Sequence, residues 1–96
     1  MNVIDIFNLG NKYQAEGNID MALQLWAECG KMSPVFSVNF INMYNVYRQR
    51  NDLPKAKECI HEFLRRPITG ETLDMIPKIK SELEEINKQL NPQPAK

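Results

Sequence analysis

The sequence predicts an all-α fold built from antiparallel helical hairpins, and two observations predict it. Apolar residues recur every three or four positions along most of the chain, which is the periodicity of amphipathic helices. The text also repeats itself at a spacing of 34 residues, so that NLGNKYQAEGNID (8–20) aligns with NMYNVYRQRNDLP (42–54). A repeat of this length is typical of one helix pair. We therefore expect about five helices in a single domain over residues 1–90.

The first copy, about residues 3–36, predicts two helices joined by a tight turn. Leu9 and Tyr13 recur at helical spacing on the first helix. Gly17 can adopt the left-handed conformation that ends a helix, and Asn18 has a side-chain oxygen that can cap the next one. That second helix stops at Gly30.

The second copy, about residues 37–68, predicts another helix pair. Ser33 and Pro34 are expected as the cap and first turn of its first helix. Asn51 tolerates the left-handed conformation, and Asp52 is placed to cap the following helix with Pro54 in its first turn. The apolar residues of the first of these helices are expected to be Phe36, Phe40, Met43, Tyr44 and Tyr47.

Several positions of the two copies carry a family resemblance. The motif residues of the first copy are Leu9, Gly10, Tyr13, Gly17, Ala22, Trp26 and Pro34. In this pattern the chain resembles the tetratricopeptide repeat. The resemblance implies a right-handed α-solenoid in which small residues such as Gly10, Ala22 and Ala56 let helices cross closely. It also implies that the first helix of each pair lines a concave groove for partners.

Residues 71–90 depart from the repeat and predict one amphipathic helix. Pro77 would interrupt a helix that starts near Glu71, so we expect a bend or a late start capped by Asp74. Such a helix can cap the open end of an array. Its spacing also allows a dimerisation helix, and hence a homodimer. The polar, proline-rich residues 91–96 are expected to be a disordered tail or the start of a linker.

The resemblance places a set of amide and apolar side chains in the groove. The candidate partner-binding residues are Phe7, Asn11, Gln14, Ile41, Asn42, Asn45, Arg48 and Gln49. Asn11 and Asn45 are equivalent in the two copies, and we expect neither Asn11 nor Gln14 to serve the packing of the scaffold. An amide offers both donors and an acceptor, which suits the backbone of a bound peptide.

One known mode of partner binding is not expected. Chaperone-binding relatives grip a partner's terminal carboxylate with two asparagines and several basic side chains. Asn11 and Asn42 match the asparagines, but Phe7 stands where the lysine is expected, and the third repeat with the remaining cations is missing. The sequence therefore favours an apolar anchor at Phe7 over a carboxylate clamp.

Composition excludes several classes of function. Twelve basic residues balance twelve acidic ones, so we expect neither nucleic-acid nor membrane partners. Cys29 and Cys59 lack the spacing of a zinc or redox motif, and His61 is the only histidine. We expect no catalytic residue, metal or cofactor, and a cytoplasmic location.

These observations predict a protein-interaction module, an adaptor or scaffold that binds a peptide or helix of a partner in its concave groove. Two alternatives stay open. The chain could be the N-terminal accessory domain of a larger enzyme, such as a glycosyltransferase, or a self-assembling scaffold. The identity of any partner is outside what the sequence predicts.

Overall fold

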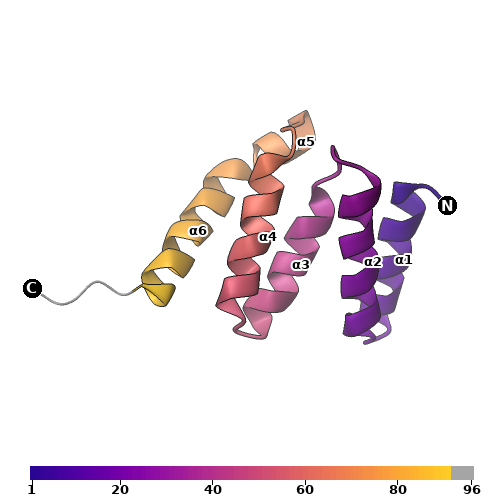
Figure 1. Ribbon diagram of the computed structural model, residues 1–96, viewed down its shortest axis with the longest axis horizontal. Coiled ribbons are helices and arrows are strands. Elements are labelled where there is room, and N and C mark those ends of the chain that lie inside the picture. The colour runs from indigo at the N-terminus through magenta and orange to yellow at the C-terminus, as the bar shows by residue number, and fades with distance from the viewer. Residues whose placement is uncertain (92–96) are drawn as a thin grey trace, which may run out of the picture.

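The computed structural model describes residues 1–91, and over this range the chain is all-helical with no strand. Its six helices are α1 (Val3–Ala15), α2 (Ile19–Met32), α3 (Val38–Gln49), α4 (Leu53–Arg65), α5 (Gly70–Leu73) and α6 (Ile76–Leu90). Figure 1 shows them in a row, with α1 to α4 running alternately up and down. The expected number of about five becomes six because the segment after α4 divides in two. Of the expected tail, residues 92–96 lie outside the described residues.

The first hairpin, α1 and α2, forms as its capping residues predict. Asn2 begins α1 by accepting a hydrogen bond from the amide of Asp5 at 2.9 Å. Gly17 adopts a φ of 86°, and Asn18 accepts a hydrogen bond from the amide of Met21. The left-handed glycine reverses the chain and the asparagine satisfies an otherwise unpaired amide, so α2 packs back along α1.

The second hairpin, α3 and α4, uses the same devices. Asn51 is the one described non-glycine residue with a positive φ, at 57°, and Asp52 caps α4 through the amide of Lys55. The expected start of α3 at Ser33 and Pro34 is wrong. Ser33 is the C-cap of α2, and α3 begins only at Val38, so Phe36 lies in the connecting loop.

The final long helix, α6, starts late, as Pro77 predicts. Thr69 and Thr72 open the short α5, and α6 follows after a break, with Pro77 in its first turn. Asp74 does not cap α6, because it is the C-cap of α5. Ile79 and Ile86 of α6 are buried against the second hairpin, whereas Leu73 of α5 is exposed.

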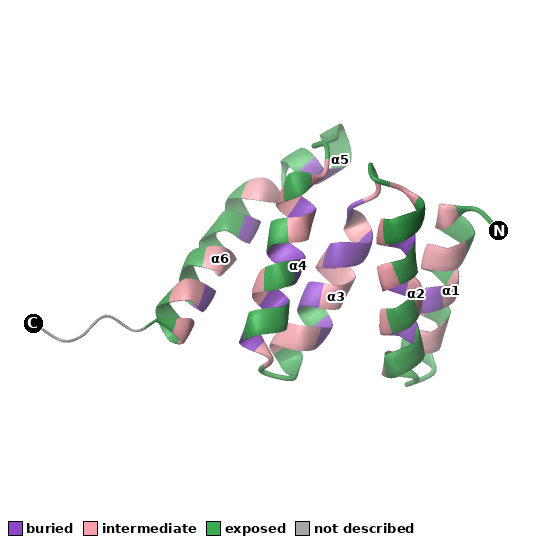
Figure 2. Cartoon of the chain, viewed as in Figure 1, coloured by how far each residue is buried: buried purple, intermediate pink, exposed green. Residues whose placement is uncertain are grey.

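Two apolar clusters form the core, and Figure 2 shows the buried residues in purple. The N-terminal cluster centres on Ala22, Trp26 and Val46, between the two hairpins. The C-terminal cluster joins α3, α4 and α6 and consists of Phe40, Tyr44, Leu53, Ala56, Cys59, Ile60, Phe63, Ile79 and Ile86. Met43 packs against both clusters, so they are continuous through α3. In the described part of the chain, no helix has the length and apolarity needed to span a bilayer.

Polar contacts join the two hairpins at both edges of the interface between them. At one edge, Arg66 donates hydrogen bonds of 3.1 Å to the carbonyls of Gly30 and Ser33 at the end of α2. Its guanidinium also lies over the ring of Phe40, 4.8 Å from the centroid. At the other edge, Arg50 pairs with Asp20 at 3.4 Å in an exposed position. The first contact is partly buried and the second is not.

Candidate functional site

The structure distributes the eight predicted groove residues over α1 and α3. Phe7, Asn11 and Gln14 come from α1, and Ile41, Asn42, Asn45, Arg48 and Gln49 come from α3. Gln14, Asn45 and Gln49 are exposed, and the other five are partly buried. Direct contact across the two helices is made by Asn11 and Asn42.

Asn11 occupies the centre of a polar bridge. Its Oδ1 accepts one hydrogen bond from the indole Nε1 of Trp26 at 3.2 Å and another from Nδ2 of Asn42 at 3.0 Å. The expectation that Asn11 serves no packing purpose is therefore wrong. A buried tryptophan N–H usually finds an acceptor, and Trp26 is completely buried. This need for an acceptor is the signal by which a packing role for Asn11 could have been predicted.

The bridge leaves one polar atom of each amide without a hydrogen bond. With Oδ1 of Asn11 and Nδ2 of Asn42 engaged, the Nδ2 of Asn11 and the Oδ1 of Asn42 make no hydrogen bond to another described residue. Asn11 thus keeps a spare donor and Asn42 a spare acceptor, on two helices that their hydrogen bond joins. This is the pattern that a peptide unit needs for two hydrogen bonds.

Phe7 is packed within the molecule. Its ring meets that of Phe36 edge to face, with the centroids 5.3 Å apart, and it also lies against the N-terminal cluster. Phe36 lies in the loop between α2 and α3. An aromatic pair of this geometry is a favourable arrangement, so Phe7 contributes to the hairpin's stability.

A cleft of about 400 Å³ lies between α3 and α6. Its walls carry apolar, amide and charged side chains: Ile41, Tyr44, Asn45, Asp74, Met75, Lys78, Ile79 and Glu82. Ile41 and Asn45 are thus the predicted groove residues that the structure brings into a concave site. The sequence did not predict the wall from α6, because the repeat ends before this helix and no local pattern places it opposite α3.

Tyr44 is the most buried polar group of this cleft. It is 2% exposed, and its hydroxyl has no hydrogen-bond partner among the described residues. Burial first, and then the Glu82 carboxylate, raise the pKa of Tyr44 to about 12 against a smaller lowering by the Arg48 guanidinium. Both charged groups therefore act on the hydroxyl from close by, and the phenol stays protonated at neutral pH.

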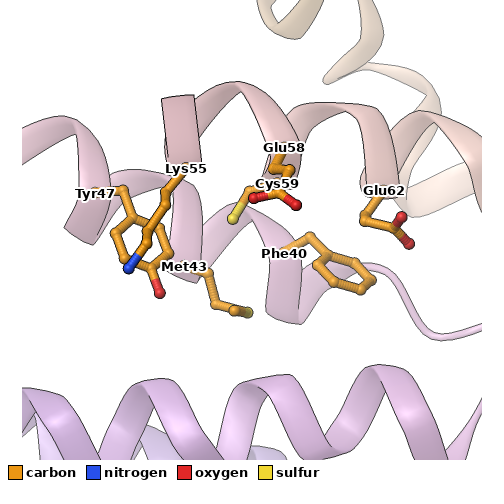
Figure 3. A pocket seen from close by; sticks show the side chains of 7 residues that line it. All are labelled: Phe40, Met43, Tyr47, Lys55, Glu58, Cys59 and Glu62. Carbon is orange, nitrogen blue, oxygen red and sulfur yellow. The ribbon is translucent and has the colours of Figure 1, made fainter. Parts of the chain in front are cut away.

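A second cleft of about 250 Å³ opens between α3 and α4 (Figure 3). Its lining comprises Phe40, Met43, Tyr47, Lys55, Glu58, Cys59 and Glu62, none of which belongs to the predicted groove. Burial first, and then the neighbouring Glu58 and Glu62 carboxylates, together raise the pKa of the Cys59 thiol to about 12. The thiol is therefore protonated at neutral pH and a poor nucleophile.

Chemistry and comparison add little to this geometry. In residues 1–91, no group of three or more His, Cys, Asp or Glu side chains is arranged to hold a metal ion. Comparisons of the chain with protein-family models, curated proteins and solved structures find no match. The two amides of the bridge and the cleft beside them therefore form the candidate functional site.

Proposed function

We propose that the protein is an interaction module of the tetratricopeptide type, which binds a peptide or helix of a partner protein along the inner faces of α1 and α3. The repeat spacing supports the proposal, as do the left-handed residues Gly17 and Asn51 at the turn of each hairpin. The close approach of α1 to Trp26 at Gly10 agrees with it too. In this reading the hairpins stack as a right-handed solenoid, and α6 caps its end.

The observation that carries the proposal is the oriented amide pair. Holding a side chain before the partner arrives lowers the entropy lost on binding. Asn11 and Asn42 are held by Trp26 and by each other, with one donor and one acceptor left over. Asn45 lies one turn beyond Asn42 on α3 and lines the neighbouring cleft. A partner backbone that follows α3 could therefore meet three amides in succession.

Selection of peptides from a displayed random library against the intact domain tests the proposal, with affinities then measured by calorimetry. Asn42→Ala is the informative variant, because Asn11→Ala would also leave the Trp26 indole without its acceptor. Loss of one net hydrogen bond of about 0.5–1.5 kcal/mol predicts binding that is about 2- to 12-fold weaker.

Asn8→Ala is the matched control, since Asn8 is exposed on the same helix as Asn11 and forms no part of the bridge. Its affinity should equal that of the unmodified domain. The proposal is wrong if selection returns no specific peptide, or if Asn42→Ala and Asn45→Ala bind the selected peptides as tightly as Asn8→Ala does.

A further inference from the structure

The last helix, α6, is attached to the two hairpins almost entirely by apolar contacts. It lies at the end of the row beside α4 (Figure 1), and its Ile79 and Ile86 are buried in the C-terminal cluster. In the described part of the chain, no hydrogen bond or ion pair connects α6 with α1, α2, α3 or α4. The Glu82 carboxylate lies close enough to the Tyr44 hydroxyl to raise its pKa, yet the hydroxyl has no hydrogen-bond partner.

The interface between the two hairpins is built differently. Asn39, which is completely buried, donates a hydrogen bond of 2.8 Å to the carbonyl of Trp26, and Asn42 donates one of 3.0 Å to Asn11. Arg66 adds two hydrogen bonds to the end of α2. At the other end of the row, α1 is also held by a hydrogen bond, because Asn11 accepts from the Trp26 indole of α2. The end of the row formed by α6 has no such bond.

An unpaired polar atom weakens the attachment of α6 further. Oδ1 of Asn87 is buried, and the Asn87 side chain has no hydrogen-bond partner within residues 1–91. Asn39 in the hairpin interface also has an unpaired Oδ1, but its Nδ2 is bonded to the Trp26 carbonyl. Withdrawing an amide from water without a partner costs free energy, and detachment of α6 would return the Asn87 amide to water. This cost offsets part of what burial of Ile79 and Ile86 contributes.

The connection between α4 and α6 makes few contacts of its own. Residues 67–71 are all exposed, and a Cβ atom at Gly70 would meet no atom within 4 Å. Ile68 is 55% exposed and Leu73 is 58% exposed, so this connection buries little apolar surface, with Thr72 as its buried residue. Segments with few buried contacts are those that open at low free energy. Detachment of α6 therefore breaks little beyond the contacts of α6 itself.

We propose that α6 is a lid that detaches and unfolds as one unit while the two hairpins stay folded, and that its opening uncovers the α3 wall of the α3–α6 cleft. A helix of 15 residues is marginal in water on its own, so α6 loses its helical hydrogen bonds when it leaves. Tyr44 shares the C-terminal cluster with Ile79 and is 2% exposed, so the opening gives solvent access to it. The inference does not rest on the proposed function, because it concerns how α6 is held and not what binds to α3.

Hydrogen exchange of the backbone amides, measured by NMR on the full chain at several urea concentrations below the unfolding transition, tests the lid. Protection of the α6 amides should be at least about tenfold lower than that of the slowest amides of α2 and α4. Exchange in α6 should also depend on urea with less than about half the slope seen in α2, because the lid exposes only part of the surface that global unfolding exposes.

Two variants separate opening of the lid from global unfolding. Gly10→Ala would place a Cβ atom 2.7 Å from the Trp26 indole and strain the first hairpin. Exchange in α2 should then be at least about tenfold faster, whereas exchange in α6 should change by less than about twofold, since its opening leaves α1 and α2 folded. Asn87→Leu removes the unpaired amide and should slow exchange in α6 at least about threefold. Lys88→Leu, at the exposed neighbouring position, is its control and should change the rates by less than about twofold.

Equal urea slopes in α6 and α2 would overturn the lid, and so would a Gly10→Ala variant in which both helices exchange faster by the same factor. If Gly10→Ala leaves exchange in α2 unchanged, the urea slopes decide alone. Unchanged exchange of α6 in Asn87→Leu would overturn the role assigned to Asn87.

Discussion

Replacement of Gly10 by alanine tests whether the close contact of α1 with Trp26 requires a residue without a side chain. A Cβ atom at residue 10 would lie 2.7 Å from Nε1 and 2.8 Å from Cδ1 of the Trp26 indole. Both distances are well inside van der Waals contact. The indole has little room to retreat, because Trp26 is completely buried and donates its N–H to Asn11.

Opposing effects decide the sign of the change. Alanine in a helix interior is favoured over glycine by about 1 kcal/mol. Overpacking of a buried site typically costs about 1–3 kcal/mol, and loss of the indole hydrogen bond costs about 0.5–1.5 kcal/mol more. The free energy of unfolding should therefore fall by about 2 kcal/mol. For a domain of this size that corresponds to a decrease in Tm of about 8–16 °C.

Urea unfolding followed by circular dichroism and by the fluorescence of Trp26, the only tryptophan, provides the measurement. Gly70→Ala is the control, because a Cβ there meets no atom within 4 Å, and its stability should change by less than about 0.5 kcal/mol. In a Trp26→Phe background the cost of Gly10→Ala should shrink. A Gly10→Ala variant as stable as the unmodified protein would refute the reasoning.

Two further predictions concern the contact of Arg66 with the end of α2, and the buried Tyr44 hydroxyl and Cys59 thiol. Arg66→Met should lower the free energy of unfolding by about 1.5–3 kcal/mol, because the carbonyls of Gly30 and Ser33 lose a charged donor. Arg65→Met changes an exposed side chain at the preceding position and should lower it by less than about 0.5 kcal/mol. Equal losses for the two variants in urea unfolding would contradict this. Stability should also fall as pH rises from about 9 towards 12. Tyr44 and Cys59 have raised pKa values in the folded state, so in this range the unfolded chain loses their protons first and is stabilised relative to the folded chain. Each group contributes a slope of up to about 1.4 kcal/mol per pH unit, so Cys59→Ala should flatten the alkaline decline measured by urea unfolding at several pH values, and an unchanged slope would contradict the assignment.

Features set by neighbouring residues were predictable from the sequence. The turn at Gly17 and the cap at Asp52 depend on the chain within four residues, so the local pattern contains all that is needed. The late start of α6 follows in the same way from Pro77, whose ring excludes it from a helix interior. All-helical structure is the sum of such local choices.

Features set by distant contacts were not predictable. Phe36 leaves the expected helix and packs on Phe7, which lies 29 residues earlier in the chain. Arg66 looks like an ordinary cation at a helix end, yet the carbonyls it binds are 33 and 36 residues away. For the candidate site, Ile41 and Asn45 line one cleft from α3, but the opposite wall from α6 follows no repeat.

The two edge contacts between the hairpins differ in strength, and this difference has a mechanical consequence. The partly buried bonds of Arg66 hold one edge, whereas the Arg50–Asp20 pair at the other edge is exposed and contributes little. At the other edge, where α2 begins and α3 ends, the hairpins are held instead by the apolar contacts of the buried Ala22 and Val46. Arg48 and Gln49 lie at that end of α3, so a partner that contacts them meets a junction held by non-directional apolar packing rather than by directional polar bonds.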